Sequence, residues 1–261
     1  MSNANLNNES STASMISVKD LQKYYKDHHV LKGVNFEVAA GDIFCLLGSN
    51  GAGKTTAVNI LTTLGKSHGG SASINGFDVA TQPDYVRASI SLTGQYAATD
   101  ELLTGRENLR LMADLRRVGS STKDKKSEAA RLLKVFRLED AADKPVSTYS
   151  GGMRRRLDIA MTLMDSSPVI FLDEPTTGLD PQNRIAMWEL IRTMAGSGTT
   201  IFLTTQYLEE AEQLADQVAI LHEGVIIAQG SPEELKQDMY CETTESLPTL
   251  EEVFLTLIGE K

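Results

Sequence analysis

Cysteine, basic charge and long apolar runs are all scarce in this sequence of 261 residues. The two cysteines, Cys45 and Cys241, stand far apart, and the four histidines show no zinc-ligand spacing, so we expect neither a disulfide nor a zinc site. The net charge of −10 lacks the basic excess of a duplex-binding protein, which predicts that the chain binds no nucleic acid. No apolar run is long enough to cross a bilayer, and the first residues do not resemble a signal peptide. We therefore expect a cytoplasmic chain that spans no membrane.

The rest of the composition is that of a folded protein, with 41% hydrophobic and 23% charged residues. Residues 1–14 are polar and contain no aromatic side chain, so we expect a disordered tail there.

Short apolar runs alternate with amphipathic segments along most of the chain, which predicts an α/β fold with largely parallel central strands. Strands are predicted over "IFCLL", "VIFL" and "TTIFLTT", and "QVAIL" and "GVIIAQG" predict a hairpin. Between Glu101 and Arg137 the apolar residues recur three and four apart, which predicts an inserted helical subdomain, placed over residues 96–161. The core is then discontinuous, over 15–95 and 162–231, and a helical extension over 232–261 is expected to pack on it.

The stretch "GSNGAGKTT", residues 48–56, has the pattern G-x-x-x-x-G-K-[ST] between a predicted strand and a predicted helix. Its glycines let the backbone N–H groups turn inward, Lys54 supplies a positive charge to phosphates, and Thr55 offers a hydroxyl to Mg²⁺. The pattern predicts a loop that binds a nucleoside triphosphate, without separating kinases, GTPases and ATPases. Its expected binding residues are Ser49, Asn50, Gly51, Ala52, Gly53, Lys54, Thr55 and Thr56.

Two carboxylates, Asp173 and Glu174, end the predicted strand in "VIFLDEP". Ligands of open α/β sheets bind at this edge, and successive strand residues face opposite ways, so the two acids should have different roles. Asp173 suits the magnesium shell, and Glu174 suits orienting and deprotonating a water. The alternative is that both acids only form a turn.

A second anion site is predicted in "YSGGMRRRLDIA", residues 149–160, where Ser150, Gly151 and Gly152 open a helix with bare backbone N–H groups. Its three arginines are expected to be solvated or paired with carboxylates rather than to bind nucleic acid.

With these motifs the sequence resembles the ATP-binding cassette (ABC) transporter ATPases, over nearly all of residues 16–258. The resemblance implies a P-loop NTPase core with a mixed, largely parallel sheet, an N-terminal antiparallel β subdomain and an inserted helical subdomain. It implies ATP and Mg²⁺ as cofactors, and a head-to-tail dimer, either a homodimer or a paired cassette. In such a dimer the "YSGGM" signature of one copy caps the ATP of the other. A transmembrane permease on a separate chain is the implied partner, and it places the protein peripherally on the cytoplasmic face of the membrane.

The resemblance also implies residue roles. Glu174 falls at the catalytic base, and Gln95 in "SLTGQYAATDELL" falls at the glutamine that touches Mg²⁺ and senses the membrane partner. Asp180 ends the D-loop "GLD", and Tyr25, with Tyr24 as the weaker candidate, falls where the family stacks an aromatic ring on adenine.

The combination of "DELLTGRENL", "YSGGMRRRLD" and "TTQYLEEAE" resembles the daunorubicin-resistance type of drug exporter ATPase. This implies export of a drug or another hydrophobic compound, with the cargo chosen by the permease. One alternative is a soluble ABC-type ATPase acting on ribosomes or DNA. A small-molecule kinase or GTPase on the same loop does not explain "YSGGM".

The sequence departs from the family pattern at three positions. Tyr149 and Met153 replace the usual leucine and glutamine of the signature, which leaves the strength of the dimer open. Gln206 stands where a histidine commonly reaches the γ-phosphate, and because an amide does not titrate near neutral pH, its expected role is positional. Alternatively Gln206 only caps the next helix. In that helix the acidic residues are expected on the solvent face, opposite a buried stripe.

We predict unequal effects for two substitutions. Losing a general base costs about 10²–10⁴-fold in rate, whereas a neutral hydrogen bond contributes roughly 0.5–1.5 kcal/mol. Glu174→Gln should therefore nearly abolish ATP turnover, while Gln206→Ala should lower it far less, both measured with the permease present. Equal losses would contradict Glu174 as the principal base.

Overall fold

The computed structural model describes residues 14–93, 99–115, 121–165, 167–239 and 247–259. The predicted tail therefore lies outside the described residues except for Ser14, which begins a strand. Gln95 and Cys241 also lie outside them.

A six-stranded sheet forms the centre of the molecule, in the order β10-β9-β3-β8-β7-β6. Its first five members along the chain are parallel, and β10 pairs antiparallel with β9, as the predicted hairpin requires. The strands are β3 (Ile43–Leu47), β6 (Ile90–Thr93), β7 (Val169–Asp173), β8 (Thr200–Thr205), β9 (Gln217–His222) and β10 (Val225–Gly230). The five residues of β3 and of β7 are all buried, as expected for parallel strands covered on both faces.

A second, antiparallel sheet has the order β2-β1-β4-β5. Its strands are β1 (Ser14–Tyr25), β2 (His28–Ala39), β4 (Gly69–Ile74) and β5 (Phe77–Asp78). It covers one face of the central sheet, and a chain of phenylalanine rings joins the two layers: Phe36 stacks on Phe44, with ring centroids 4.9 Å apart, and Phe44 on Phe202, at 5.3 Å. Such offset aromatic contacts add to the stabilisation that burial provides.

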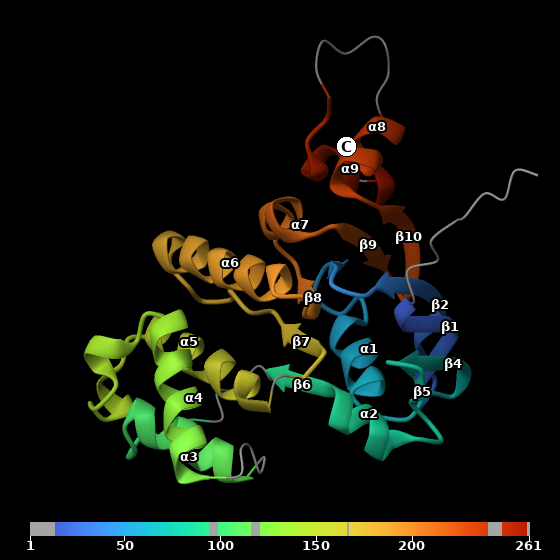
Figure 1. The fold of residues 1–261 in the computed structure, drawn as a ribbon. Coiled ribbons are helices and arrows are strands. Elements are labelled where there is room, and N and C mark those ends of the chain that lie inside the picture. Colours follow the sequence, from blue (N-terminus) through green and yellow to red (C-terminus); the bar gives the residue numbers. More distant parts are fainter. Residues whose placement is uncertain (1–13, 94–98, 116–120, 166, 240–246, 260–261) are drawn as a thin grey trace, which may run out of the picture.

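Helices lie on both faces of the central sheet (Figure 1). Beside the antiparallel sheet lie α1 (Lys54–Leu61) and α2 (Pro83–Ser89). The helical lobe consists of α3 (Gly105–Leu115), α4 (Thr122–Val135) and α5 (Gly151–Thr162), with the 3-10 turns Glu139–Ala141 and Val146–Thr148, and a third turn, Leu163–Asp165, follows α5. The remaining helices are α6 (Pro181–Gly196), α7 (Leu208–Leu214), α8 (Pro232–Asp238) and α9 (Leu250–Leu257).

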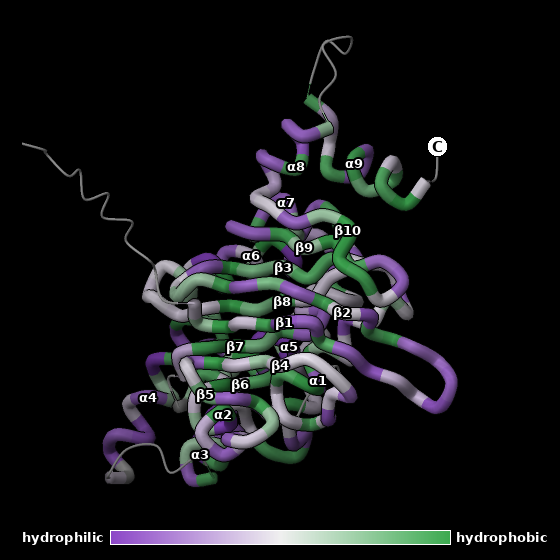
Figure 2. Tube along the Cα trace, turned by 90° about the vertical axis from the view of Figure 1, so that its right-hand side faces the viewer, coloured by the Kyte–Doolittle hydropathy of each residue, from purple (hydrophilic) through white to green (hydrophobic). Residues whose placement is uncertain are grey.

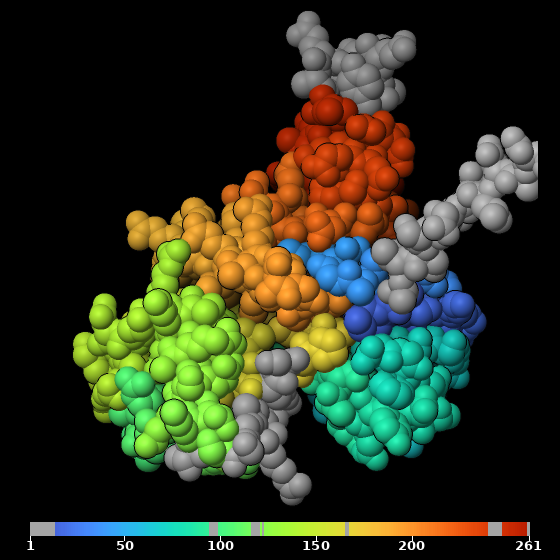
Figure 3. Space-filling model, in the orientation of Figure 1, coloured from blue at the N-terminus to red at the C-terminus, as the bar shows by residue number. Residues whose placement is uncertain are grey.

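Alternate residues of each central strand belong to two separate apolar cores. Phe44 and Phe202 pack with α1 and the antiparallel sheet, while Cys45 and Leu203 pack with the helical lobe and with α6 to α9. Figure 2 shows apolar segments along the stacked strands and polar ones on outer helices such as α4 and α8. In Figure 3 the green helical lobe and the red C-terminal helices stand out as separate bulges of the surface. The predicted α/β fold, with its mixed sheet, antiparallel sheet and inserted helices, is confirmed.

The predicted C-terminal helix docks on the core, as expected. Leu250 and Val253 of α9 are buried, and Phe254 and Leu257 pack against the same cluster. No helix within the described ranges is both long and apolar enough to cross a membrane.

The acidic residues of α7 are predicted on its solvent face, and for Glu210 this is wrong. The side chain of Glu210 is fully buried, and the indole Nε1–H of Trp188 donates to its Oε1 at 3.2 Å. Its neighbour Glu209 is exposed. Burial is the main cause that raises the pKa of Glu210, and hydrogen bonding from Thr205 is the largest opposing cause.

This burial predicts a pH-dependent effect of Glu210→Gln. A carboxyl whose pKa is raised on folding stabilises the protein fully below its unfolded-state pKa, about 4.3, and this stabilisation is lost as pH rises. Glutamine does not titrate, so the variant should gain Tm relative to the wild type as pH rises above that value. Thermal melts across pH 4 to 8 measure the difference. Glu209→Gln removes the same charge from the exposed side, and an identical pH trend for both variants would contradict burial as the cause.

Candidate active site

The ends of three parallel strands bring the predicted site residues together. Leu47, the last residue of β3, is in register with Thr205 of β8, and Thr204 is in register with Asp173 of β7. The loop of residues 48–56, called the phosphate loop below, follows β3 directly, as Gln206 follows β8 and Glu174 follows β7. All three therefore leave the sheet at one edge. This is the edge where ligands of parallel sheets bind.

The phosphate loop closes around the ammonium group of Lys54. This lysine begins α1, is only 4% exposed, and donates from Nζ to the carbonyl oxygens of Gly48 at 2.8 Å and Ser49 at 3.2 Å. Gly53, the residue before the helix, has a φ of 114°, and a Cβ on Gly48 would lie 2.4 Å from the Leu221 carbonyl oxygen. Glycine is therefore required by backbone conformation at one end of the loop and by close packing at the other.

A cavity of about 270 Å³ opens in front of the loop. It is lined by three loop residues, Asn50, Gly51 and Gly53, by the first turn of α1 from Lys54 to Thr56, and by Val30 and Glu174. Of the other loop residues, Ser49 accepts a hydrogen bond from Lys54 through its carbonyl oxygen, and the side chain of Ala52 is buried. The loop thus presents backbone and a positive charge to one small polar cavity, a shape and charge suited to phosphate groups.

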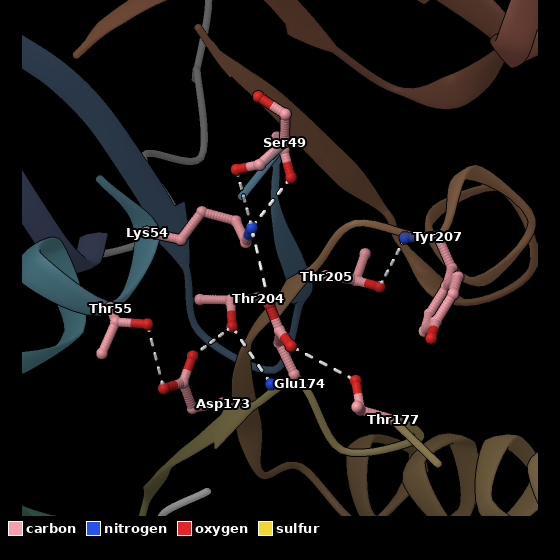
Figure 4. A network of polar contacts seen from close by, with 10 residues as sticks. Ser49, Lys54, Thr55, Asp173, Glu174, Thr177, Thr204, Thr205 and Tyr207 are labelled. Carbon is pink, nitrogen blue, oxygen red and sulfur yellow. Dashed lines mark hydrogen bonds and ion pairs between the residues drawn. The ribbon is translucent and has the colours of Figure 1, made fainter. Parts of the chain in front are cut away.

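Asp173 and Glu174 point to different partners, as their alternation along the strand predicts (Figure 4). Asp173 accepts from the Thr204 hydroxyl at 2.5 Å through Oδ1 and from the Thr55 hydroxyl at 3.3 Å through Oδ2. Glu174 lies with Oε1 3.5 Å from Lys54 Nζ, and its Oε2 accepts from Thr177 at 3.2 Å. Asp173 therefore faces the loop threonine, and Glu174 faces the cavity.

Glu174 has a left-handed backbone, with a φ of 47°. Its N–H donates to both the carbonyl oxygen and the hydroxyl of Thr204, at 3.2 and 3.1 Å. Thr204 thus orients both acids, a role that no sequence motif indicates. Its only sequence signal is a hydroxyl residue at the end of a buried strand.

Gln206 follows β8 at this edge and is half-buried. Its side chain makes no hydrogen bond to any residue that the structure describes. The Thr205 hydroxyl accepts from the Tyr207 N–H at 3.0 Å, and no side chain caps α7. The alternative role of Gln206 as a helix cap is therefore contradicted.

The signature residues begin α5 and do not line the phosphate cavity. Ser150 caps the helix by accepting from the Met153 N–H at 3.3 Å, and Gly151 is exposed. Tyr149, which replaces the usual leucine, is buried and donates its hydroxyl to the Ala141 carbonyl at 2.7 Å. The tyrosine therefore anchors the signature in the helical lobe.

Asp180 caps α6, because its carboxylate accepts from the Asn183 N–H at 3.0 Å and from the Asn183 side chain at 2.6 Å. A Cβ on Gly152 would lie 2.6 Å from the same asparagine, so the signature packs directly against the start of α6.

The three arginines of α5 all have partners within the chain. Arg154 pairs with Glu101 at 2.8 Å, Arg155 pairs with Asp158 at 3.3 Å, and Arg156 reaches the carbonyl oxygens that end α4. The predicted carboxylate pairing is confirmed for two of the three.

Of the two candidate adenine-stacking rings, Tyr24 is already stacked on His29, with centroids 3.9 Å apart. Tyr25 is 52% exposed, with Lys23 Nζ 5.0 Å from its ring centroid. The exposed ring of Tyr25 is the one that remains open to stacking.

Comparison with known proteins agrees with this geometry. The family profile for the ABC transporter matches residues 31–177. The chain is 49% identical over 221 residues to a daunorubicin resistance ATP-binding protein of Streptomyces coeruleorubidus, covering 85% of this chain and 68% of that protein. It is 49% identical to a doxorubicin resistance ATP-binding protein of Mycobacterium tuberculosis, covering 81% and 64%, and 39% identical to a Nod factor export ATP-binding protein of Burkholderia orbicola, covering 88% and 75%. The chain thus spans about two thirds of the length of the resistance proteins.

Solved structures give the same family. An ATP-binding subunit of an ABC transporter superposes with a TM-score of 0.80 at 31% identity, covering 94% of this chain and all of that one. A dimeric ATP-binding cassette in a post-hydrolysis state with ADP and Pi superposes with a TM-score of 0.74 at 26% identity, covering 83% and 98%. The chain therefore belongs to the ABC transporter family, as an ATP-binding subunit with ATPase activity.

Proposed function

We propose that this ATPase dimerises head to tail around two ATP molecules and drives an export permease carried on a separate chain. The observation that carries the catalytic part is the pairing at one sheet edge of a buried phosphate-binding lysine, Lys54, with a carboxylate that faces the cavity, Glu174.

In the proposed mechanism Glu174 takes the proton of the attacking water. Its Oε1 faces the cavity beside Lys54, and Thr177 holds its other oxygen, so the carboxylate is oriented before substrate arrives. Lys54 and the loop N–H groups from residues 49 to 56 would hold the phosphates. Gln206 would orient water or phosphate from the same edge, without exchanging a proton.

The residues present fit a magnesium ion. The Thr55 hydroxyl and the Asp173 carboxylate lie 3.3 Å apart and are hard oxygen ligands of the kind that Mg²⁺ takes together with phosphate oxygens. Gln95 is proposed as a further ligand. When bound, the ion would neutralise charge that develops on the transferred phosphoryl group. Thr204 fixes Asp173 toward that position through its hydrogen bond to the other carboxylate oxygen.

The dimer is proposed because the signature helix presents an open N-terminus away from the cavity of its own chain. Gly151 is exposed, and apart from its chain neighbours and the backbone of α5, no atom of the described residues lies within 4 Å of the position of a Cβ. Ser150, Gly151 and Gly152 would cap the ATP of a second cassette, with Asp180 beside them and Tyr25 stacking on adenine. We propose residues 96–161 as the subdomain that carries this surface, on a core of 15–95 and 162–231 with the extension 232–261.

The permease is proposed from exposed apolar side chains on the helical lobe. Leu102, just before α3, is 88% exposed, and Leu115 and Leu111 on α3 are 69% and 43% exposed; we take these three apolar side chains as the proposed contact with another protein. Such a partner would hold the chain at the cytoplasmic face of the membrane. The names of the resistance and Nod factor relatives support export of a drug or another hydrophobic compound. An acidic chain whose signature arginines are internally paired gives no support to a ribosome- or DNA-acting role.

Glu174→Gln should trap the dimer, because ATP still binds while hydrolysis stops. We expect light scattering after size exclusion to show a doubled mass with ATP and Mg²⁺, and a monomer with ADP. Adding Gly151→Asp should abolish the dimer through charge repulsion with the capped phosphate, whereas Gly196→Asp, at another glycine with open space around it, should not. A Glu174→Gln protein that binds ATP and stays monomeric would contradict the proposal.

Affinity purification of the tagged chain from solubilised membranes should recover a polytopic partner. Leu102→Glu should lose that partner, because a charge cannot be buried in an apolar contact, while Ile185→Glu on α6 should keep it. Recovery of only soluble or ribosomal proteins would overturn the transporter role.

Reconstituted vesicles with the partner should move daunorubicin when the cassette is wild type and not when it carries Glu174→Gln.

A further inference from the structure

We propose that Arg155 is a positioning residue that holds the catalytic carboxylate of its own chain in place from the signature helix. This inference rests on the proposed role of Glu174 as base. Arg155 lies on α5, little more than one turn beyond Ser150, and its side chain is 13% exposed.

The guanidinium group of Arg155 donates hydrogen bonds to the backbone on both sides of Glu174. Its Nε donates to the Pro175 carbonyl oxygen at 3.0 Å, and its Nη2 donates to the Asp173 carbonyl oxygen at 3.2 Å. The two carbonyls belong to the residues immediately before and after Glu174. Both accept from the same edge of the planar guanidinium group, the edge formed by Nε and Nη2. Only an arginine presents two parallel N–H donors in this arrangement.

The backbone between these two carbonyls, at Glu174, is strained. Glu174 has a φ of 47°, in the left-handed region that residues other than glycine, asparagine and aspartate rarely occupy. A return to extended backbone would rotate the neighbouring peptides and turn their carbonyls away from a common point. The two hydrogen bonds from Arg155 therefore favour the left-handed turn, and that turn aims the Glu174 side chain at the cavity and at Lys54.

The position of Arg155 is itself fixed. Its Nη1 lies 3.3 Å from the Asp158 carboxylate one turn along α5, and Asp158 is 3% exposed. The neighbouring arginines act elsewhere: Arg154 binds Glu101, and Arg156 reaches carbonyl oxygens at the end of α4. Of the arginines in "MRRRL", the middle one alone contacts the Asp173–Pro175 backbone within the described part of the chain.

This link has a consequence for a dimer. Ser150 and Arg155 lie on one helix, so a change at the signature, where a second cassette would contribute its ATP, is transmitted to the base of the same chain. Each site would then influence the other through α5 and the two carbonyls around Glu174.

The first test compares Arg155→Lys with the control Arg154→Lys in ATPase assays with the permease. Lysine keeps the charge but offers its donors from a single nitrogen, so it cannot hold the two carbonyls in the geometry that Nε and Nη2 of arginine give. We expect kcat to fall about ten- to a hundredfold in Arg155→Lys, since misplacement of a reacting group by about 1 Å has effects of this size, with little change in KM for ATP. Arg154→Lys should match the wild type. Equal behaviour of the two lysine variants would overturn the inference.

The second test is a double-mutant cycle on stability, which does not depend on turnover. Glycine adopts a φ of 47° without strain, whereas Glu174, once released from Arg155, can leave the strained turn and recover part of the lost stability. The loss of Tm caused by Arg155→Lys should therefore be smaller in the wild type than in a Glu174→Gly background. Equal losses, a larger loss in the wild type, or an Arg155→Lys protein that fails to fold in both backgrounds would overturn the proposal.

The two proposals fail separately. If Glu174→Gln keeps substantial turnover, the proposed function of Glu174 is wrong. If Glu174→Gln is inactive while the cycle shows no coupling, the base assignment stands and the role of Arg155 is wrong.

Discussion

The register of three parallel strands is the constraint on which the active site depends. β8 lies between β3 and β7, with Thr205 opposite Leu47 and Thr204 opposite Asp173. A slip of one residue in β7 would exchange the faces of Asp173 and Glu174. Asp173 would then lose both of its threonine partners, and the cavity would lose its carboxylate. The strand register thus decides which of the two acids reaches the cavity.

Burial on both faces of the sheet specifies that register. Phe44, Phe171 and Phe202 pack in the core shared with the antiparallel sheet, while Cys45 and Leu203 pack in the core shared with the helices. A register shift would drive phenylalanine rings into the helix side and smaller aliphatic or thiol side chains into the aromatic layer, with overpacking on one face and voids on the other. The aromatic layer also fixes the antiparallel sheet, which brings Val30 to the cavity wall.

The sequence predicts those site residues that lie on one continuous segment each. Lys54 and Glu174 follow apolar strands in recognisable patterns, and both lie where those patterns predict. Thr204 and Val30 reach the site from segments whose local patterns carry no chemistry, so only the folded pairing reveals them. Glu210 is missed for a related reason: a helix with three acids has a polar pattern, and the indole that makes its burial possible belongs to α6.

The left-handed backbone of Glu174 lowers folding stability at the position of the proposed base. For a residue with a Cβ this conformation costs roughly 1–2 kcal/mol, a noticeable share of the 5–15 kcal/mol by which domains are typically stable. A chain selected for folding alone would be better served by glycine or asparagine here, and neither supplies a carboxylate to the cavity. In the proposed mechanism the glutamate thus gives up part of the folding stability at this turn and in return places a carboxylate at the cavity.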